Sequence, residues 1–184
     1  MKRLAILTVG KTHSGKSTFA KKLDKELNHS IIIDQDHHAG FINTHYPTLQ
    51  PKSGPNTLKH SISKLIVDYA KENTNLHFIV CNSNRSKAGR AYLLNEIYKK
   101  DEFIRIIVHF NISYDTLLDR VTQSERNTNI LRNASSFKEV LLRQQAEDVI
   151  DPDEDEADFF FTISNNDETN EVIRRIVDIS NQNC

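Results

Sequence analysis

The most informative stretch of the chain is LAILTVGKTHSGKSTFAKKL, residues 4–23. Its first six residues form a short apolar run, which is typical of a strand buried on both faces of a sheet. Gly10–Ser17 then fits the pattern G-x-x-x-x-G-K-[ST] at every fixed position. After it, Phe19, Ala20 and Leu23 recur at helical spacing. The stretch therefore predicts a strand, a phosphate-binding turn and an amphipathic helix in succession.

Each fixed residue of this turn has a physical role. Gly10 and Gly15 let the backbone curl so that successive N–H groups point into one concavity, and the following helix adds its positive N-terminal end. We expect Lys16 to reach the β- and γ-phosphates of ATP and Ser17 to offer its hydroxyl to Mg²⁺. His13 fills a free position, so its side chain is expected to face solvent. The expected nucleotide contacts are Gly10, Thr12, His13, Ser14, Gly15, Lys16, Ser17 and Thr18.

The rest of the chain alternates short apolar runs with stretches of helical period, which predicts an α/β fold with a parallel sheet covered by helices on both faces. The predicted strands are Leu4–Val9, Ile31–Ile33, Leu76–Cys81, Phe103–Phe110 and Phe159–Ile163. The predicted helices are Lys16–Leu27, Leu58–Lys71, Lys87–Lys100, Tyr114–Val121, Phe137–Asp148 and Glu168–Ile179.

Three segments interrupt this alternation. Gly40–Thr57 holds three of the four prolines and two of the five glycines, which predicts an irregular or mobile loop. Thr122–Ser136 is polar and carries arginines between two predicted helices. Asp148–Asp158 contains seven carboxylates, and we interpret it as a solvated loop before the last strand.

Length and composition favour one compact domain over residues 1–184. The formal net charge is −1, so no global charge favours nucleic acid or an anionic membrane as a partner. No apolar stretch approaches the roughly 20 residues that span a bilayer. The two cysteines, Cys81 and Cys184, suit neither a metal knuckle nor a disulfide framework, so we expect a reducing, cytoplasmic location.

Two carboxylates, Asp34 and Asp36, follow the second predicted strand directly. Ligands of open α/β sheets gather at the carboxyl ends of the strands. A kinase needs one carboxylate there to accept the proton of the attacking hydroxyl and another to help order Mg²⁺ through water. Asp34 and Asp36 are the candidates for these two roles. The chain has no Asn-Lys-x-Asp motif, which disfavours a GTPase, and no Ser-Gly-Gly-Gln motif, which disfavours a transporter ATPase. Asn82 follows the third strand in place of an acidic pair, which disfavours a motor hydrolase.

These motifs resemble the small P-loop kinases grouped with phage-type polynucleotide 5′-hydroxyl kinase, zeta toxins and adenylylsulfate kinases. Asp34-Gln35-Asp36 resembles the acidic element that ends their second strand. This likeness implies that Asp36 is the catalytic carboxylate, and Asp34 is then expected to help Ser17 order Mg²⁺. Asn82-Ser83-Asn84 resembles their Asp-Thr-Asn element, with Arg90 on the helix beyond. The resemblance implies five parallel strands in the order 2-3-1-4-5. It also implies a lid near residues 122–136, and Arg120, Arg126 and Arg132 lie in or close to that range. We take Arg120 as a nucleotide contact and Arg126 as the catalytic arginine.

The chain departs from these relatives at two positions. Ala39 stands where they carry an arginine that grips the acceptor's phosphate, and Asn82 replaces an acidic residue. His37 or His38 is a candidate to line the acceptor site in place of that arginine; as neighbours they point apart, which disfavours a shared metal site. We expect an ATP-dependent phosphotransferase that moves the γ-phosphoryl group of ATP–Mg²⁺ to a hydroxyl of a small molecule or nucleotide. Its expected partners are therefore ATP and an unidentified hydroxyl-bearing acceptor. Two alternatives stay open, namely an ATP-binding or ATP-hydrolysing protein without kinase activity and a polynucleotide 5′-hydroxyl kinase. The oligomeric state has no signature in the sequence.

Overall fold

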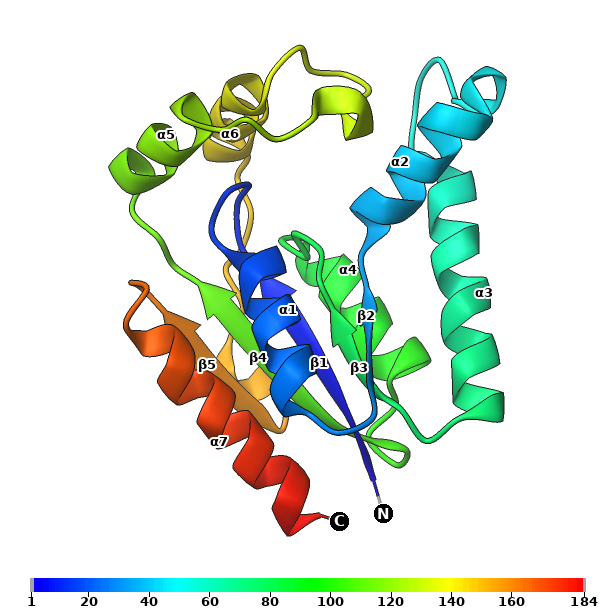
Figure 1. Ribbon diagram of the computed structural model, residues 1–184, viewed down its shortest axis with the longest axis vertical. Helices are drawn as coiled ribbons and strands as arrows, with labels where there is room; N and C mark the ends of the chain where they lie inside the picture. The colour runs from blue at the N-terminus through cyan, green and yellow to red at the C-terminus, as the bar shows by residue number, and fades with distance from the viewer. Residues whose placement is uncertain (1, 184) are drawn as a thin grey trace.

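The computed structural model describes residues 2–183, which form a parallel five-stranded sheet with helices on both faces (Figure 1). The strand order is β2-β3-β1-β4-β5, so the predicted order 2-3-1-4-5 is confirmed. The strands are β1 (Arg3–Val9), β2 (Ser30–Ile33), β3 (His77–Val80), β4 (Phe103–Phe110) and β5 (Phe159–Ile163). The helices are α1 (Lys16–Glu26), α2 (Gln35–His45), α3 (Thr57–Asn73), α4 (Lys87–Tyr92), α5 (Tyr114–Thr122), α6 (Phe137–Ala146) and α7 (Glu168–Gln182).

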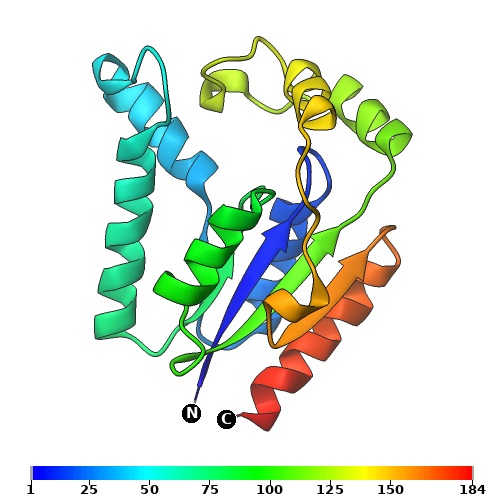
Figure 2. The ribbon, with the colours of Figure 1, turned by 180° about the vertical axis from the view of Figure 1, so that it is seen from behind.

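Alternation along β1 divides the core into two halves. Leu4 and Ile6 are fully buried in one half, together with side chains of α1 and α7. Ala5 and Leu7 are fully buried in the other, together with side chains of α3 and of the segment after α4. The helices α1 and α7 lie side by side on one face in Figure 1, and α4 covers the opposite face in Figure 2. Such coverage explains why the strands read as continuous apolar runs.

Above the carboxyl ends of the strands the chain forms two arms, which flank the turn after β1 (Figure 1). One arm consists of α2 and the upper end of α3, and the other consists of α5, α6 and the segment that joins them. Both arms follow strands directly, α2 after β2 and α5 after β4, so the topology brings them to the same edge of the sheet. This edge is where ligands of open α/β sheets bind.

The prediction of an irregular loop over Gly40–Thr57 is wrong in its first part. Residues 40–45 continue α2, and Pro47–Leu49 form a 3-10 turn. The helix begins where the Asp34 side chain accepts a hydrogen bond from the Asp36 amide at 2.9 Å. Only two α2 residues, Ala39 and Ile42, are buried. The apolar residues of this segment therefore do not recur often enough to predict a helix from the sequence. The helix predicted over Lys87–Lys100 also ends early, since α4 passes into a π-helical turn at Leu93–Ile97.

Two acidic residues of the Asp148–Asp158 run are not solvated, which corrects that interpretation. Glu156 pairs with the fully buried Arg90 at 2.6 Å, and Asp158 pairs with Arg105 at 3.2 Å. Burial alone would raise the pKa of Glu156, but hydrogen bonds from Arg90 and from the Asp153 amide outweigh it and lower that pKa. These ion pairs anchor the segment before β5 against the sheet.

Cys81 is buried and carries a free thiol, whereas Cys184 lies outside the described residues. Across the described part of the chain, no helix combines the length and apolarity that a membrane span requires.

Candidate functional site

The turn between β1 and α1 depends on two glycines with positive φ. Gly10 has a φ of 155°, and a Cβ there would lie 2.9 Å from the Cβ of Phe110. Gly15, with a φ of 102°, precedes the first residue of α1, so the N-terminus of the helix opens into the turn. The Gly10 amide donates to the Ser83 carbonyl at 2.9 Å, which ties the turn to the loop after β3. Side chains larger than hydrogen are strained at both glycines.

Lys16 lies at the base of this turn. Its Nζ donates to the Lys11 carbonyl oxygen at 2.6 Å and to the Ser14 hydroxyl at 3.1 Å. Burial lowers the pKa of Lys16 to about 8, and the charges of Asp36 and Asp34 oppose that shift. An anionic phosphate beside Nζ would favour the charged form, so the site is poised to take up negative charge.

The carboxyl ends of β2 and β3 place two carboxylates and a thiol beside the turn, next to the Ser17 hydroxyl of α1. Asp34 is 5% exposed and caps α2, while Asp36, on the first turn of α2, faces the cavity. The Cys81 thiol donates to the Ser17 hydroxyl oxygen at 3.6 Å. Burial raises the pKa of Cys81 to about 11, so it remains a neutral thiol rather than a metal-binding thiolate.

The segment between α5 and α6 reaches across this edge to α2. Arg126 Nη2 donates to Asp36 Oδ2 at 2.8 Å, which pairs the predicted catalytic arginine with the predicted catalytic base. The Arg126 guanidinium also lies 5.2 Å from the ring centroid of Phe137. Further along, Asn43 Nδ2 donates to the Asn129 carbonyl at 2.6 Å. The segment therefore rests on α2 and covers the turn, and we refer to residues 123–136 as the lid segment.

His13 does not face solvent, which corrects the expectation for its side chain. Its Nε2 forms a 2.7 Å hydrogen bond with the Ser124 hydroxyl, and its ring packs edge to face on Phe137 at 4.8 Å. Arg120 Nη1 donates to the His13 carbonyl at 3.2 Å, and its Nη2 donates to Asn166 Oδ1 at 3.0 Å. His13 thus joins the turn to the lid segment, and Arg120 joins the turn to the loop after β5.

These groups enclose a cavity of about 630 Å³. Its wall includes residues that sequence reasoning missed, above all Lys59 of α3 and Gln144 of α6. Burial lowers the pKa of Lys59, and no carboxylate among residues 2–183 lies within 4.0 Å of its Nζ. Gln144 Oε1 accepts a hydrogen bond from the Thr12 amide at 2.7 Å. Neither residue belongs to a motif, because each reaches the site only through the folded chain.

The other candidate residues have different surroundings. The Asn82 side chain accepts a hydrogen bond from the Gln35 amide at 2.9 Å. His37 lines the cavity, whereas His38 forms a 2.7 Å hydrogen bond with Ser63 that joins α2 to α3. Arg132 Nη1 donates to the Pro51 carbonyl at 3.3 Å. His38, Arg132 and the buried Arg90 are therefore engaged in contacts within the protein, outside the cavity lining.

The donor set at this edge suits Mg²⁺. Ser17 offers a hydroxyl oxygen and Asp34 a carboxylate, and Mg²⁺ in kinases is commonly held by one or two such groups together with waters and substrate phosphates. Among the described residues, no three His, Cys, Asp or Glu side chains converge to hold an ion by themselves. The edge therefore fits a metal that arrives with a nucleotide better than a closed protein site.

The sheet order, the glycine turn and the covering lid segment define a P-loop kinase-like fold. The chain belongs to the AAA domain family, whose profile matches residues 6–149. No curated protein matches the sequence significantly.

Three solved structures illustrate the shared fold. Shikimate kinase from Acinetobacter baumannii, in complex with shikimate, is 16% identical at a TM-score of 0.58, with 98% of this chain and 94% of that chain covered. The Mycobacterium tuberculosis APS kinase, in complex with AMPPNP and APS, is 12% identical at a TM-score of 0.59, with 98% of each chain covered. Kti12 from Chaetomium thermophilum, in complex with ADP-AlF3, is 15% identical at a TM-score of 0.62, with 95% and 97% covered. At these identities the likeness shows the fold.

Proposed function

We propose that the protein is an ATP-dependent phosphotransferase that moves the γ-phosphoryl group of ATP to a hydroxyl of a small molecule. The observation that carries this proposal is the placement of Asp36 and Arg126 over the Gly10–Ser17 turn, 2.8 Å from each other. A base for the acceptor and a cation for the transferred group are the two protein groups that phosphoryl transfer requires beside a phosphate cradle. Kinases among the solved structures of this fold support it.

In the proposed reaction, the turn amides and Lys16 bind the triphosphate. The acceptor oxygen attacks the γ-phosphorus while the bond from that phosphorus to the bridging oxygen breaks, and ADP leaves with the electron pair. Asp36 accepts the acceptor's proton. Arg126 is hydrogen-bonded to the Asp36 carboxylate in this structure. Arg126 must therefore release that carboxylate before transfer and turn to the phosphoryl oxygens. The lid segment, residues 123–136, would exclude water during the step.

Mg²⁺, held by Ser17 and Asp34, would supply charge neutralisation for the phosphates. Arg120, which contacts the His13 carbonyl of the turn and Asn166 in the loop after β5, would contact the nucleotide through the turn. We also propose that the described fold acts as one domain, since its lid and its phosphate turn contact each other directly through His13.

A second candidate function is ATP binding or hydrolysis without an acceptor other than water. Two features favour it. Asn82 stands in place of an acidic residue, and the Asp36 carboxylate is already paired with Arg126. The two functions differ in their product, since one releases inorganic phosphate and the other forms a phosphomonoester.

The test is incubation with labelled ATP, Mg²⁺ and a panel of sugars, nucleosides, other alcohols and oligonucleotides. We expect a new phosphomonoester with the parent protein. Asp36→Asn should retain ATP affinity and lose about 10²- to 10⁴-fold in transfer rate, the range that general base catalysis contributes. Asp101→Asn, an exposed carboxylate before β4, is the matched control. Transfer by Asp36→Asn at the parental rate would disprove the assignment of the base, and inorganic phosphate as the sole product would favour the second function.

A further inference from the structure

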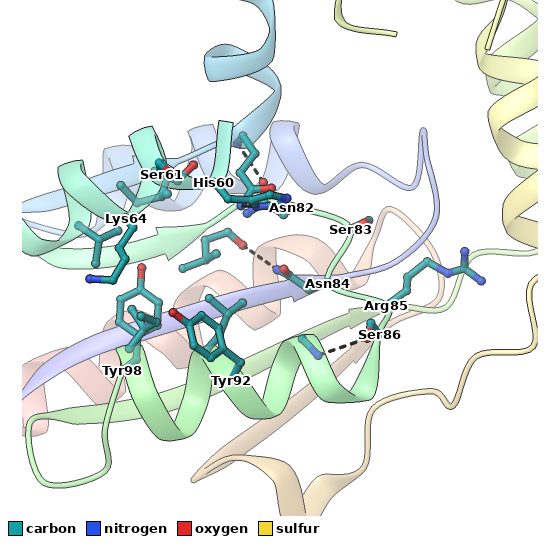
Figure 3. A pocket seen from close by; sticks show the side chains of 18 of the residues that line it. His60, Ser61, Lys64, Asn82, Ser83, Asn84, Arg85, Ser86, Tyr92 and Tyr98 are labelled. Atoms are coloured by element: carbon teal, nitrogen blue, oxygen red, sulfur yellow. Dashed lines mark hydrogen bonds between the residues drawn. The ribbon is translucent and has the colours of Figure 1, made fainter. Parts of the chain in front are cut away.

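A second and larger cavity, of about 770 Å³, lies between α3 and α4 (Figure 3). Its floor includes Ile33 and Val80 at the ends of β2 and β3, and Val67 of α3 faces Leu93 and Ile97 beyond α4. This volume falls within the range of small-molecule pockets, and such pockets combine apolar walls with a few polar groups. Most of the residues that line this cavity have no part in the proposed nucleotide site.

The two cavities adjoin through a shared wall. Gln35, Asn82, Ser83 and Gln144 line both of them. The Gln35 amide donates to Asn82 Oδ1 at 2.9 Å, and Asp36 follows Gln35 in the chain. A molecule seated between α3 and α4 therefore meets the nucleotide cavity at the wall that also carries the proposed base.

The walls of the larger cavity carry little uncompensated charge. Lys64 forms an ion pair with Asp68, and Arg85 pairs with Glu147 at 2.6 Å. Burial lowers the pKa of His60, which favours its neutral form. Hence the permanent cations in this wall already have carboxylate partners, and an anionic ligand would have to displace them.

One polar group in the cavity has no partner within the protein. Tyr98 is 1% exposed, and its ring packs on Phe78 and Phe103 at 5.4 Å from each, so its orientation is fixed. None of the side-chain hydrogen bonds among residues 2–183 involves its hydroxyl, and no fully buried polar side-chain atom of these residues lacks a partner, so this oxygen keeps accessible surface at the cavity. Figure 3 shows this hydroxyl directed into the cavity, toward α3 and the side of Lys64. A hydroxyl that faces a cavity and has no protein partner is expected to bind a ligand or water there.

We propose that the cavity between α3 and α4 holds the body of the phosphoryl acceptor, and that this acceptor is a neutral alcohol with a largely apolar frame. Its reacting hydroxyl would pass the Gln35–Asn82 wall toward Asp36, and a polar group at its far end would hydrogen-bond to the Tyr98 hydroxyl. This inference rests on the proposed kinase function, and it disfavours phosphorylated nucleotides and carboxylates as acceptors.

The test uses a panel of neutral aryl and cycloalkyl diols, each paired with an analogue in which one hydroxyl is replaced by a carboxylate. Binding is measured by ligand-observed NMR, and phosphorylation by transfer from labelled ATP. We expect the neutral members to bind and to accept phosphate, and the anionic analogues to bind at least about tenfold more weakly. In Tyr98→Phe the KM of the best alcohol should rise about three- to tenfold, the worth of one hydrogen bond, while the KM for ATP stays unchanged. Tyr69→Phe, an exposed tyrosine of α3 outside the cavity, is the matched control and should behave like the parent.

The outcomes separate this inference from the proposed function. If ATP binds and a phosphomonoester forms only with anionic acceptors, or if Tyr98→Phe matches the parent with every neutral alcohol, the inference is wrong and the kinase function stands. If the neutral alcohols bind between α3 and α4 but no acceptor is phosphorylated, the kinase function is wrong, and with it the acceptor role of the cavity.

Discussion

At the scale of single residues, the site depends on charges held in partly buried positions. Lys16 has no carboxylate partner within 4.0 Å among residues 2–183, and it donates instead to the Lys11 carbonyl and the Ser14 hydroxyl. Burial without an ion pair disfavours its charged form, which is why its pKa falls to about 8. A phosphate would provide the missing opposite charge. We therefore expect the affinity for nucleotide to be coupled to the protonation of this one side chain.

We predict that nucleotide affinity depends on pH through Lys16. Below its pKa of about 8 the lysine is already charged, so affinity should be flat. Above that pKa the free protein must take up a proton on binding, so the association constant should fall by up to about tenfold per pH unit. Calorimetry with Mg·AMPPNP between about pH 7 and pH 9 measures this. Lys16→Arg, whose charge persists over that range, should flatten the profile if it binds. A parental affinity that stays constant across the range would contradict the coupling.

The sequence predicted the residues of the phosphate turn because they are contiguous and each is fixed by local geometry. Lys59 could not be predicted in the same way, since a lone lysine on a helical stretch is ordinarily a solvated residue. The surroundings of His13 were also predicted wrongly, because Ser124 and Phe137 reach it from more than 100 residues along the chain.

At the scale of elements, the lid segment meets α2 through two polar contacts, Arg126 with Asp36 and Asn43 with Asn129, and through Ile130, which lies beside Gly40. Arg126 and Asp36 are 39% and 47% exposed as side chains, and their pair is the ionic contact between the two arms among the described residues. Exposed pairs of this kind stabilise a protein by about 0 to 1 kcal/mol. Such a weak contact permits the lid segment to open and Arg126 to change partners.

Arg126→Ala is therefore expected to separate catalysis from stability. The rate of transfer should fall by about 10³-fold or more, as for other arginines that stabilise a phosphoryl transition state. The thermal midpoint should change by no more than about 4 °C, because the lost pair is solvated. Steady-state kinetics and thermal unfolding on the same preparation measure both. Arg174→Ala, an exposed arginine of α7, controls for loss of a surface charge. Parental transfer by Arg126→Ala would show that the arginine has no catalytic role.

The elements themselves were predictable to different degrees. The strands were predicted well because each is a compact apolar run, and the helix α7 because its apolar residues recur at helical spacing. The helix α2 was missed over residues 40–45, since it buries only Ala39 and Ile42 and its start depends on the Asp34 cap.

At the scale of the whole molecule, the buried pair of Arg90 and Glu156 joins parts of the chain that lie far apart. Arg90 also donates to the carbonyls of Asn84, Arg85 and Ile150, so it holds the loop after β3 against the segment before β5. That loop in turn fixes the phosphate turn through the Gly10–Ser83 hydrogen bond. The resemblance to P-loop kinases predicted the strand order. The buried ion pair could be recognised only from the structure, because opposite charges far apart in the sequence give no pattern that shows which of them pair.

We predict that Arg90→Met destabilises the fold by about 3 to 5 kcal/mol, because it leaves Glu156 buried without its partner. Urea unfolding followed by circular dichroism measures this loss. The double variant Arg90→Met, Glu156→Gln should recover part of it, since the unpaired charge is then removed. Equal stability of the single variant and the parent would show that the ion pair is dispensable.

Calorimetric titration of the parent protein and of Lys16→Ala with Mg·AMPPNP measures most directly whether the turn after β1 binds a nucleoside triphosphate. We predict saturable heat with one site per chain for the parent and for Asp36→Asn, and a loss of affinity of at least about 100-fold for Lys16→Ala, which removes a charge-assisted contact to the phosphates. No heat with the parent, or the same affinity with Lys16→Ala, would contradict nucleotide binding at this turn.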